Sequence, residues 1–296
     1  MAVPSQRLIK LVAEAVGDAS CVVALGGGAD SAVLLASTVA AIGANRTRAV
    51  FVAHGLETSP LLEIAATAIT ARCGVPLDVR RAPVEEGPNL EARARDARYA
   101  ALAVAVHQGE LLLTGHTQDD QAETVIMRLA QGAGATGLAG IPATREGIVR
   151  PFLAVSRADL RDEADAIRLP YVDDPANADD RFTRSRTRAS VMPILESSYG
   201  DETKSNLARS SELLRVDDAY LDELAAGITV RVDGARAFVP AAAIATLPPP
   251  VAARVVRRAM KSIASPGFRG TSRDVSSVVA AATEGGTIQL GSGWLA

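Results

Sequence analysis

Apolar and polar residues follow two different periods along the first half of the chain. Short β-branched runs, separated by longer helix-like patterns, occur at residues 21–25 (CVVAL), 49–54 (AVFVAH), around 79 (PLDVRRA) and 110–116 (ELLLTGH). This alternation predicts parallel strands joined by helices, in a doubly wound α/β fold that binds ligands at the carboxyl ends of its strands. Segments 25–31, 54–59 and 115–120 each follow a predicted strand, so we expect them to meet at one edge of the sheet.

The pattern changes after residue 150. Residues 151–199 are polar and rich in arginine, and a long helical pattern follows as far as Leu224. Beyond it, TVRVDGARAFV alternates on both sides of Asp233-Gly234, which predicts a hairpin with a type I′ turn. Three prolines at 248–250 then precede a predicted helix at 251–263. We therefore expect three parts: an α/β domain at 1–198, a helical linker at 199–225 and a small α+β C-terminal domain at 226–296.

Composition narrows the class of protein. A chain of 296 residues is long enough for about two domains. Its net charge of −3 gives no overall positive field, so any contact with nucleic acid has to be local. Cys21 and Cys73 are the only two cysteines, which favours buried apolar roles and a reducing cytoplasm. The longest weakly polar run, residues 31–44, is shorter than the roughly 20 residues of a membrane span, so we expect no membrane contact.

A glycine turn joins the first predicted strand to a helix. Its three glycines allow the backbone to approach an anion, and the free N–H groups at the start of the helix favour negative charge. Such turns also use glycine for conformation alone, so the turn by itself leaves both interpretations open. It matches neither a Walker A loop nor G-x-G-x-x-G. The residues expected to bind phosphate are Gly26, Gly27, Gly28, Ala29, Asp30 and Ser31.

The segment GHTQDDQAET at 115–124 follows the last of the four predicted strands. His116 stands at the strand end, and Asp120 and Glu123, three residues apart, share one face of the next helix. Acidic residues at a helix start also complement the helix dipole, which is the simpler explanation for the pair alone. Beside a phosphate-binding turn, however, the two carboxylates indicate a site for a magnesium ion or an amine substrate.

Two arginines three residues apart lie on the predicted helix that precedes this strand. Arg95 and Arg98 could be solvated surface residues, which is the usual outcome for such a pair. The helix leads into the strand that carries His116, so one of the two could reach a triphosphate. A guanidinium group suits phosphate because its planar fork donates two hydrogen bonds at once.

Several motifs in order resemble known protein families. The glycine turn resembles the S-G-G-x-D-S loop of the PP-loop pyrophosphatases, which split ATP between the α and β phosphates. Over the first two hundred residues the chain resembles the tRNA(Ile)-lysidine synthases, through the turn at Gly26, HGL at 54–56, AR-x-x-RY at 94–99, GH-x-x-DD-x-x-ET at 115–124, RLAQGAGATGLAGI, VRPFL and DDPAN-x-x-x-RFTR-x-R.

The resemblance implies a ligase that uses ATP and free L-lysine to modify the first anticodon cytidine of the isoleucine tRNA with a CAU anticodon. In that family the cytidine C2 oxygen attacks the α-phosphate, which releases pyrophosphate. The lysine ε-amine then attacks C2 and expels AMP. The resemblance implies that residues 26–31 hold the pyrophosphate.

The family's chemistry also implies roles for the other candidate residues. Asp30 would orient the turn or hold Mg²⁺, and Arg95 would stabilise the phosphates or the cytidine. Asp120 and Glu123 would bind the lysine ammonium group and accept its proton, while His116 would shape the same pocket.

Two basic clusters are candidates for tRNA contact. The segment RFTRSRTR at 181–188 concentrates positive charge, although a solvated loop is an equal alternative. The second cluster belongs to the predicted C-terminal helix and consists of Arg254, Arg257, Arg258 and Lys261, which fall on one helix face. Such a stripe suits contacts with tRNA phosphates. We therefore expect the C-terminal domain to bind tRNA.

Three positions depart from the family pattern: Gly26 replaces a serine, Ala53 a common aspartate and Ser185 an asparagine. The lost serine hydroxyl predicts weaker ATP binding with activity retained. A tRNA sulfur transferase of the same fold is one alternative, but that chemistry generally uses catalytic or cluster-binding cysteines. A catalytically lapsed tRNA-binding relative is another, and the presence of Asp30, Asp120 and Glu123 argues against it. The sequence leaves open whether the chain forms a homodimer.

Overall fold

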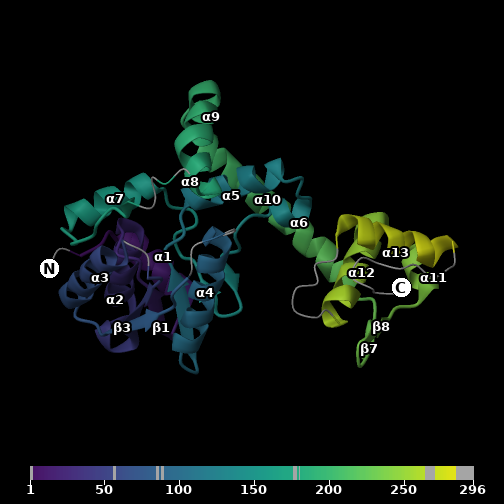
Figure 1. Ribbon diagram of the computed structural model, residues 1–296, viewed down its shortest axis with the longest axis horizontal. Coiled ribbons are helices and arrows are strands. Elements are labelled where there is room, and N and C mark those ends of the chain that lie inside the picture. The colour runs from purple at the N-terminus through teal and green to yellow at the C-terminus, as the bar shows by residue number, and fades with distance from the viewer. Residues whose placement is uncertain are drawn as a thin grey trace. The chain divides into compact units, whose positions relative to one another are not determined.

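The computed structural model describes residues 3–55, 58–84, 87, 90–175, 179, 181–263 and 271–284. The chain divides into two compact units, Met1–Glu212 and Leu213–Ala296 (Figure 1). The division falls inside one helix, α10 (Thr203–Ala226). The predicted domain limits at 198 and 225 lie on either side of this division.

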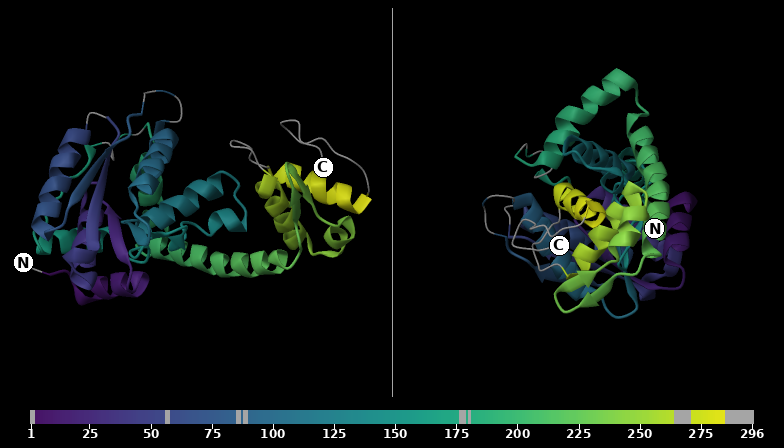
Figure 2. Two further views of the ribbon diagram at one scale, coloured as in Figure 1. Left: turned by 90° about the horizontal axis from the view of Figure 1, so that it is seen from below. Right: turned by 90° about the vertical axis from the view of Figure 1, so that its right-hand side faces the viewer.

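Unit 1 is built on a six-stranded sheet with the order β3-β2-β1-β4-β6-β5. The four predicted strands are present as β1 (Ser20–Ala24), β2 (Thr47–Ala53), β3 (Leu77–Arg81) and β4 (Glu110–Thr114), all parallel. Two short strands that the sequence pattern does not predict, β5 (Thr144–Arg145) and β6 (Ile148–Val149), extend the sheet beyond β4. The mostly parallel sheet with helices on both faces confirms the predicted doubly wound α/β class, and only the short pair β5–β6 among the described strands of this sheet is antiparallel (Figure 2).

Helices alternate with these strands along unit 1. They are α1 (Gln6–Val16), α2 (Ala29–Ile42), α3 (Ser59–Cys73), α4 (Leu90–Ala105), α5 (Gln118–Ala130), α6 (Ala135–Leu138), α7 (Arg157–Ala166), α8 (Thr183–Arg186) and α9 (Met192–Tyr199), with a 3-10 turn at Ala44–Arg46 and a π-helical turn at Thr187–Val191. Within the described residues, no helix is both long and apolar enough to cross a membrane.

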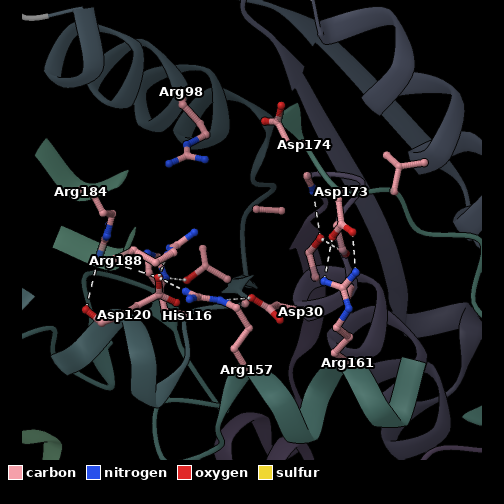
Figure 3. A pocket seen from close by; sticks show the side chains of 18 of the residues that line it. Asp30, Arg98, His116, Asp120, Arg157, Arg161, Asp173, Asp174, Arg184 and Arg188 are labelled. Carbon is pink, nitrogen blue, oxygen red and sulfur yellow. Dashed lines mark hydrogen bonds and ion pairs between the residues drawn. The ribbon is translucent and has the colours of Figure 1, made fainter. Parts of the chain in front are cut away.

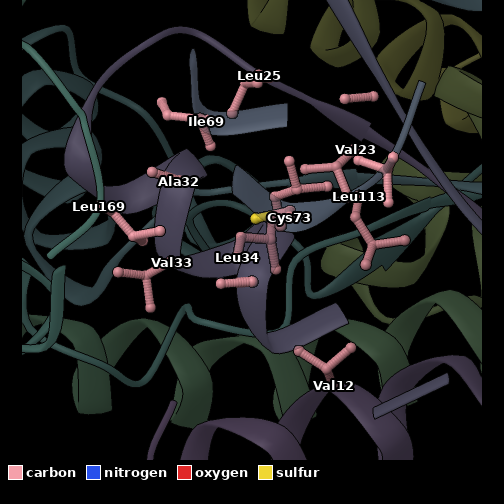
Figure 4. Packing of buried hydrophobic residues seen from close by; sticks show 14 of the residues in the cluster. Val12, Val23, Leu25, Ala32, Val33, Leu34, Ile69, Cys73, Leu113 and Leu169 are labelled. Atoms are coloured by element: carbon pink, nitrogen blue, oxygen red, sulfur yellow. The ribbon is translucent and has the colours of Figure 1, made fainter. Parts of the chain in front are cut away.

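The buried strands explain the nearly continuous apolar runs of the sequence. Neighbouring residues of a strand point to opposite faces of the sheet. Cys21 and Val23 of β1 therefore face the core formed with α1, α2, α3 and α7, and Figure 4 shows Val23 there. Val22 faces a smaller core beneath α4. Cys73 lies in the larger core too, and burial raises the pKa of both thiols to about 11. The prediction of two buried, apolar cysteines is confirmed.

Unit 2 contains the predicted hairpin and helix around a core of its own. Its elements are β7 (Arg231–Asp233), β8 (Arg236–Phe238), α11 (Ala241–Thr246), α12 (Pro249–Ile263) and α13 (Ser272–Glu284). The apolar face of α12, including Val255 and Val256, packs against Val275 of α13. The prediction of a small α+β arrangement therefore agrees with the described elements.

The hairpin turn differs from the prediction in its type. Asp233 pairs with Arg236, so Gly234 and Ala235 are the central residues. A type I′ turn needs a left-handed backbone at both central positions. Gly234 has φ +56°, but Ala235 is not among the residues with positive φ. Alanine avoids that region because of its Cβ, so only the glycine adopts it and the turn is not type I′.

Candidate active site

The glycine turn between β1 and α2 is held by one hydroxyl. The Gly26 amide donates to Ser31 Oγ at 3.1 Å, and that hydroxyl donates to the Gly28 carbonyl at 3.1 Å. Gly27 has φ +84°, and a Cβ there would lie 2.9 Å from the Leu62 carbonyl oxygen. The turn therefore requires glycine at this position both for its backbone conformation and for its close approach to α3.

The end of β4 lies directly against this turn. A Cβ on Gly115 would come within 3.1 Å of the Ser31 nitrogen and 3.2 Å of the Asp30 carbonyl carbon. Segments 25–31 and 115–120 therefore meet, as the topology predicts. None of the described residues of segment 54–59 lines the pocket formed there. His54, directly after β2, lies instead 3.3 Å from the Ala82 carbonyl oxygen.

A pocket of about 370 Å³ opens at the carboxyl ends of β1 and β4 (Figure 3). Its charged lining consists of Arg98, Arg157, Arg161, Arg184 and Arg188 together with Asp30, Asp120, Asp173 and Asp174. Arg184 and Arg188 belong to the segment predicted as a tRNA-contacting loop. Arg157, Arg161, Asp173 and Asp174 were not singled out from the sequence as site residues. The pocket is thus more basic than the sequence motifs alone indicate.

Most of the predicted site residues reach this pocket. Those that line it are Gly26, Gly28, Ala29, Asp30, Ser31, His116 and Asp120. Gly27, Glu123 and Arg95 do not belong to the lining. Arg95 instead lies over the ring of Tyr99, 4.9 Å from the ring centroid, and Arg98 takes the position at the pocket wall. The prediction that one arginine of this helix reaches the pocket therefore applies to Arg98.

Asp120 both caps helix α5 and lines the pocket, which are the two roles that the sequence left open. Its Oδ2 accepts hydrogen bonds from the backbone N–H and the hydroxyl of Thr117, at 2.8 and 2.9 Å, in a capping box at the start of α5. Its Oδ1 lies 3.0 Å from Arg157 Nη2. Burial alone would raise the pKa of Asp120, but Arg157 and Arg184 outweigh it and lower that pKa to about 2. Asp120 is therefore an ionised carboxylate.

Glu123 lies one turn further along α5 and is almost completely buried. Only 2% of its side chain is exposed, yet three guanidinium groups surround it. Its carboxylate oxygens lie 3.3 Å from Arg157, 3.0 Å from Arg184 and 2.7 Å from Arg188. Glu123 therefore fixes the arginines behind the pocket wall and does not itself face the cavity.

Arg157 is the central residue that sequence reasoning missed. Its guanidinium contacts Asp30 at 3.5 Å, Asp120 at 3.0 Å and Glu123 at 3.3 Å. Its backbone N–H donates to Asp119 Oδ2 at 2.8 Å. Burial opposes the charged form, but the surrounding carboxylates raise the pKa of Arg157. In the sequence it is a single arginine at the start of a helix, so no local pattern indicates its position.

Burial shifts the pKa values of two further groups in the pocket. It raises the pKa of Asp30 to about 6, although Arg157 acts in the opposite direction. It lowers the pKa of His116 to about 3, so the imidazole is neutral near pH 7. The Thr114 hydroxyl lies 2.9 Å from His116 Nδ1 and orients the ring. The site thus places a neutral imidazole between ionised carboxylates and arginines.

The first of the two basic clusters predicted to contact tRNA is divided: Arg184 and Arg188 are directed inward, whereas Arg181 and Arg186 are exposed. Residues 183–191 are helical, and Arg184 and Arg188 turn toward Glu123. Arg186 donates to the Arg181 carbonyl oxygen at 3.0 Å. The loop alternative for this segment is therefore wrong, because a buried carboxylate organises the arginines from within.

The second cluster, the stripe on α12, does not form a continuous exposed row either. Arg254 pairs with Asp218 and with Asp222, and only 10% of its side chain is exposed. Arg258 donates to the carbonyl oxygens of Ala225 and Ile228. Two of the four predicted phosphate-contacting residues are thus used inside unit 2. The reason is that α10 supplies carboxylates and a helix end beside this face of α12.

The fold and the turn define a PP-loop domain. The family model described as the PP-loop domain matches residues 1–195 of the chain. The α/β sheet and the glycine turn before α2 both lie within the matched residues.

The chain belongs to the tRNA(Ile)-lysidine synthase family. It is 46% identical over 226 residues to the tRNA(Ile)-lysidine synthase of Salinispora tropica, 72% of this chain and 67% of that protein. Similar matches are found with the synthases of Pseudomonas fluorescens, at 39% identity over 74% of this chain, and Thermobifida fusca, at 38% identity over 88% of it. The family predicted from the ordered motifs is thereby confirmed.

The length of the relatives differs considerably. The chain spans 51% of the Pseudomonas fluorescens protein, but 83% of the Thermobifida fusca protein.

Among solved structures, the U34-tRNA thiolase NcsA from Methanococcus maripaludis, determined with its [4Fe-4S] cluster, superposes with a TM-score of 0.55 and 18% identity. That superposition covers 71% of this chain and 78% of the thiolase. It shows a shared fold.

Proposed function

We propose that this chain is an ATP-dependent ligase that attaches L-lysine to C2 of the first anticodon cytidine of the isoleucine tRNA with a CAU anticodon. The reaction would pass through an adenylated cytidine and release pyrophosphate and then AMP. The observation that carries the proposal is the charge pattern of the pocket. Arginines for a triphosphate and ionised carboxylates for an ammonium group line one cavity, in a chain of the tRNA(Ile)-lysidine synthase family.

The phosphates of ATP are assigned to the side of the pocket formed by the glycine turn. The free N–H groups at the start of α2 attract anions, and the Ser31 hydroxyl stands within the same turn. Arg157 and Arg161 enter the pocket from α7, close to Asp30 (Figure 3). Charge that develops on the departing pyrophosphate would be stabilised by these preorganised donors.

Mg²⁺ fits this side of the pocket through Asp30. Magnesium ions in nucleotide sites are commonly held by one or two carboxylates together with phosphate oxygens and water. Asp30 lines the pocket, and no group of three or more metal-ligating side chains occurs in the described part of the chain. When bound, the ion would neutralise phosphate charge.

The ammonium group of lysine is assigned to Asp120. This carboxylate lines the pocket and is ionised, whereas Glu123 lies behind the wall among three arginines. With a pKa of about 2, Asp120 is too weak a base to remove a proton from an ammonium group at neutral pH. We therefore assign Asp120 to binding and Glu123 to positioning of the arginines, and neither to proton transfer.

His116 is assigned to the centre of the pocket, between the phosphate and lysine sides. As a neutral imidazole it offers one donor and one acceptor nitrogen, and its ring is oriented by Thr114. It would serve as a hydrogen-bonding group toward the cytidine or the transferred phosphate. A group with this low pKa does not supply positive charge at neutral pH.

The proposed function is tested by incubating the full chain with ATP, lysine and unmodified isoleucine tRNA, followed by mass analysis of the nucleosides. The expected product is cytidine with a lysine adduct, formed only when all three substrates are present. A transcript of the same tRNA with a different base at the first anticodon position is the matched control. Release of AMP without a lysine adduct would refute the proposal.

Sulfur transfer is the second reaction that this fold could support, and the cysteines argue against it. Cys21 and Cys73 both lie in the hydrophobic core and neither lines the pocket. Burial raises the pKa of each thiol to about 11, which keeps it protonated and unreactive at neutral pH. A thiolation assay with the same tRNA is therefore expected to give no product.

A further inference from the structure

The arginines of the pocket differ in how they are paired. Arg157, Arg184 and Arg188 converge on Glu123, and Arg161 pairs with Asp173 at 2.5 Å. Arg98, on α4, forms no hydrogen bond or ion pair with any residue that the structure describes. Among the five arginines that line the pocket, it is the one whose donors are all available to a ligand.

The position of Arg98 directs these donors into the cavity. Figure 3 shows its side chain extending from α4 toward the pocket, opposite Asp30 and Arg157. Arg95, one turn earlier on the same helix, does not belong to the lining and lies over the ring of Tyr99. The two arginines of the AR-x-x-RY motif thus have different environments, one stacked on an aromatic ring and one facing the cavity.

The surroundings of Arg98 disfavour an isolated positive charge. Protein packed around the group lowers the pKa of Arg98, and the like charges of Arg95 and Arg184 add to this effect. Tyr99 and Asp120 act in the opposite direction but do not outweigh the lowering. An anion bound at this position would compensate the positive charge of Arg98, because it would pair with a guanidinium group that forms no ion pair with a described side chain.

We propose that Arg98 is the pocket residue that binds an oxyanion of a substrate through its guanidinium fork. The inference rests on the proposed function, which brings two such groups into the pocket. One is a phosphate of ATP and the other is the α-carboxylate of lysine. Both present two oxygens in a plane, which matches the two parallel donors of arginine.

The experiment compares Arg98→Ala with Arg95→Ala in the full chain. ATP affinity is measured by calorimetry without tRNA or lysine. The affinities of lysine and of cadaverine, which has the same two amino groups but no carboxylate, are measured on the chain saturated with a non-hydrolysable ATP analogue. A charge-assisted hydrogen bond corresponds to about a tenfold to hundredfold change in affinity.

The two sources of the oxyanion give different results. If Arg98 binds a phosphate, Arg98→Ala weakens ATP about tenfold or more and leaves the preference for lysine over cadaverine unchanged. If it binds the carboxylate, Arg98→Ala weakens lysine by that factor, and neither ATP nor cadaverine changes. Arg95→Ala is expected to change none of these affinities by more than about threefold.

Unchanged affinities for both ATP and lysine in Arg98→Ala would overturn the inference, as would an effect of Arg95→Ala equal to that of Arg98→Ala. Arg98→Lys keeps the charge and most of the packing, so it is expected to recover part of the lost affinity. If the alanine variant fails to fold, the affinities for ATP and lysine are measured on Arg98→Lys instead. The tRNA product assay is separate: a wild-type chain that binds ATP but forms no lysine adduct contradicts the proposed function, while the ATP measurement still tests Arg98.

Discussion

Arginines and carboxylates gather in both compact units, but in different surroundings. In unit 1, three arginines contact both Glu123 and Asp120. In unit 2, Arg254 lies between Asp218 and Asp222. The arginines and Asp120 of the first cluster line an open cavity, whereas the side chain of Arg254 in the second is only 10% exposed. Charged groups that line a cavity remain within reach of a ligand, and an arginine that is almost enclosed by protein serves as a structural contact.

The largest expected effect is that of Glu123→Gln in the pocket cluster. Glutamine keeps the shape but removes a negative charge that all three arginines contact, so their mutual repulsion is less well compensated. Breaking a buried ion pair in this way costs about 3 to 5 kcal/mol, and misaligned arginines are expected to slow lysine transfer by about 100-fold or more. Urea unfolding measures the stability and the tRNA assay measures the rate.

The matched control for this variant is Glu63→Gln. Glu63 also pairs with an arginine, Arg81, but 64% of that arginine side chain is exposed. Solvent weakens such a pair, so the expected loss of stability is below about 1 kcal/mol with no change in rate. Equal effects of the two substitutions would show that Glu123 has no special relation to the site.

A smaller effect is expected from Arg254→Ala in unit 2. The substitution leaves Asp218, whose side chain is 11% exposed, without this arginine. We expect a loss of about 2 to 3 kcal/mol in unfolding free energy, because a nearly buried carboxylate loses a paired positive charge. ATP affinity is expected to remain unchanged, since the arginine belongs to unit 2. Urea unfolding and calorimetry with ATP measure the two quantities.

Arg257→Ala, three residues further along α12, is the control for this variant. No ion pair of Arg257 is found in the described part of the chain, and a substitution of this kind is expected to change stability by less than about 0.5 kcal/mol. A drop in ATP affinity in Arg254→Ala would contradict the distinction between a binding cluster and a structural one.

The sequence pattern predicts the fold better than it predicts these clusters. The buried strands are recognisable because apolar side chains on both faces leave continuous runs such as CVVAL, and glycine marks the turn where Gly27 approaches α3. Arg157 and Arg254 could not be assigned in the same way. Their partners lie more than thirty residues away in the sequence, and a row of charges on a helix does not indicate what the neighbouring helix presents to it.

The lowered pKa of Asp120 predicts an acid-dependent part of the stability. Because the folded-state pKa, about 2, lies below the ordinary value of 3.8, ionised Asp120 stabilises the folded chain above pH 3.8. This contribution is lost as the pH falls from about 4 to about 2. The difference corresponds to about 2 kcal/mol.

Asp120→Asn tests this contribution. The variant is expected to be less stable than the wild type at pH 7 by about 2 kcal/mol, and the gap is expected to close as the pH falls toward 2. Urea unfolding at several pH values measures both chains. A gap that stays constant across this range would mean that Asp120 acts through its capping hydrogen bonds and not through its charge.

The smallest expected effect is a gain, from Gly26→Ser in the glycine turn. Gly26 lines the pocket, and a Cβ there would meet only Ser31 Oγ, at 4.0 Å, so a serine fits without displacing its neighbours. Its hydroxyl would add one hydrogen bond to a phosphate, which corresponds to about a tenfold higher ATP affinity. Gly26→Ala is the control, because it adds the Cβ without the hydroxyl. If serine and alanine have the same ATP affinity by calorimetry, the hydroxyl does not reach the phosphates and the departure from the family pattern at this position has no effect on ATP binding.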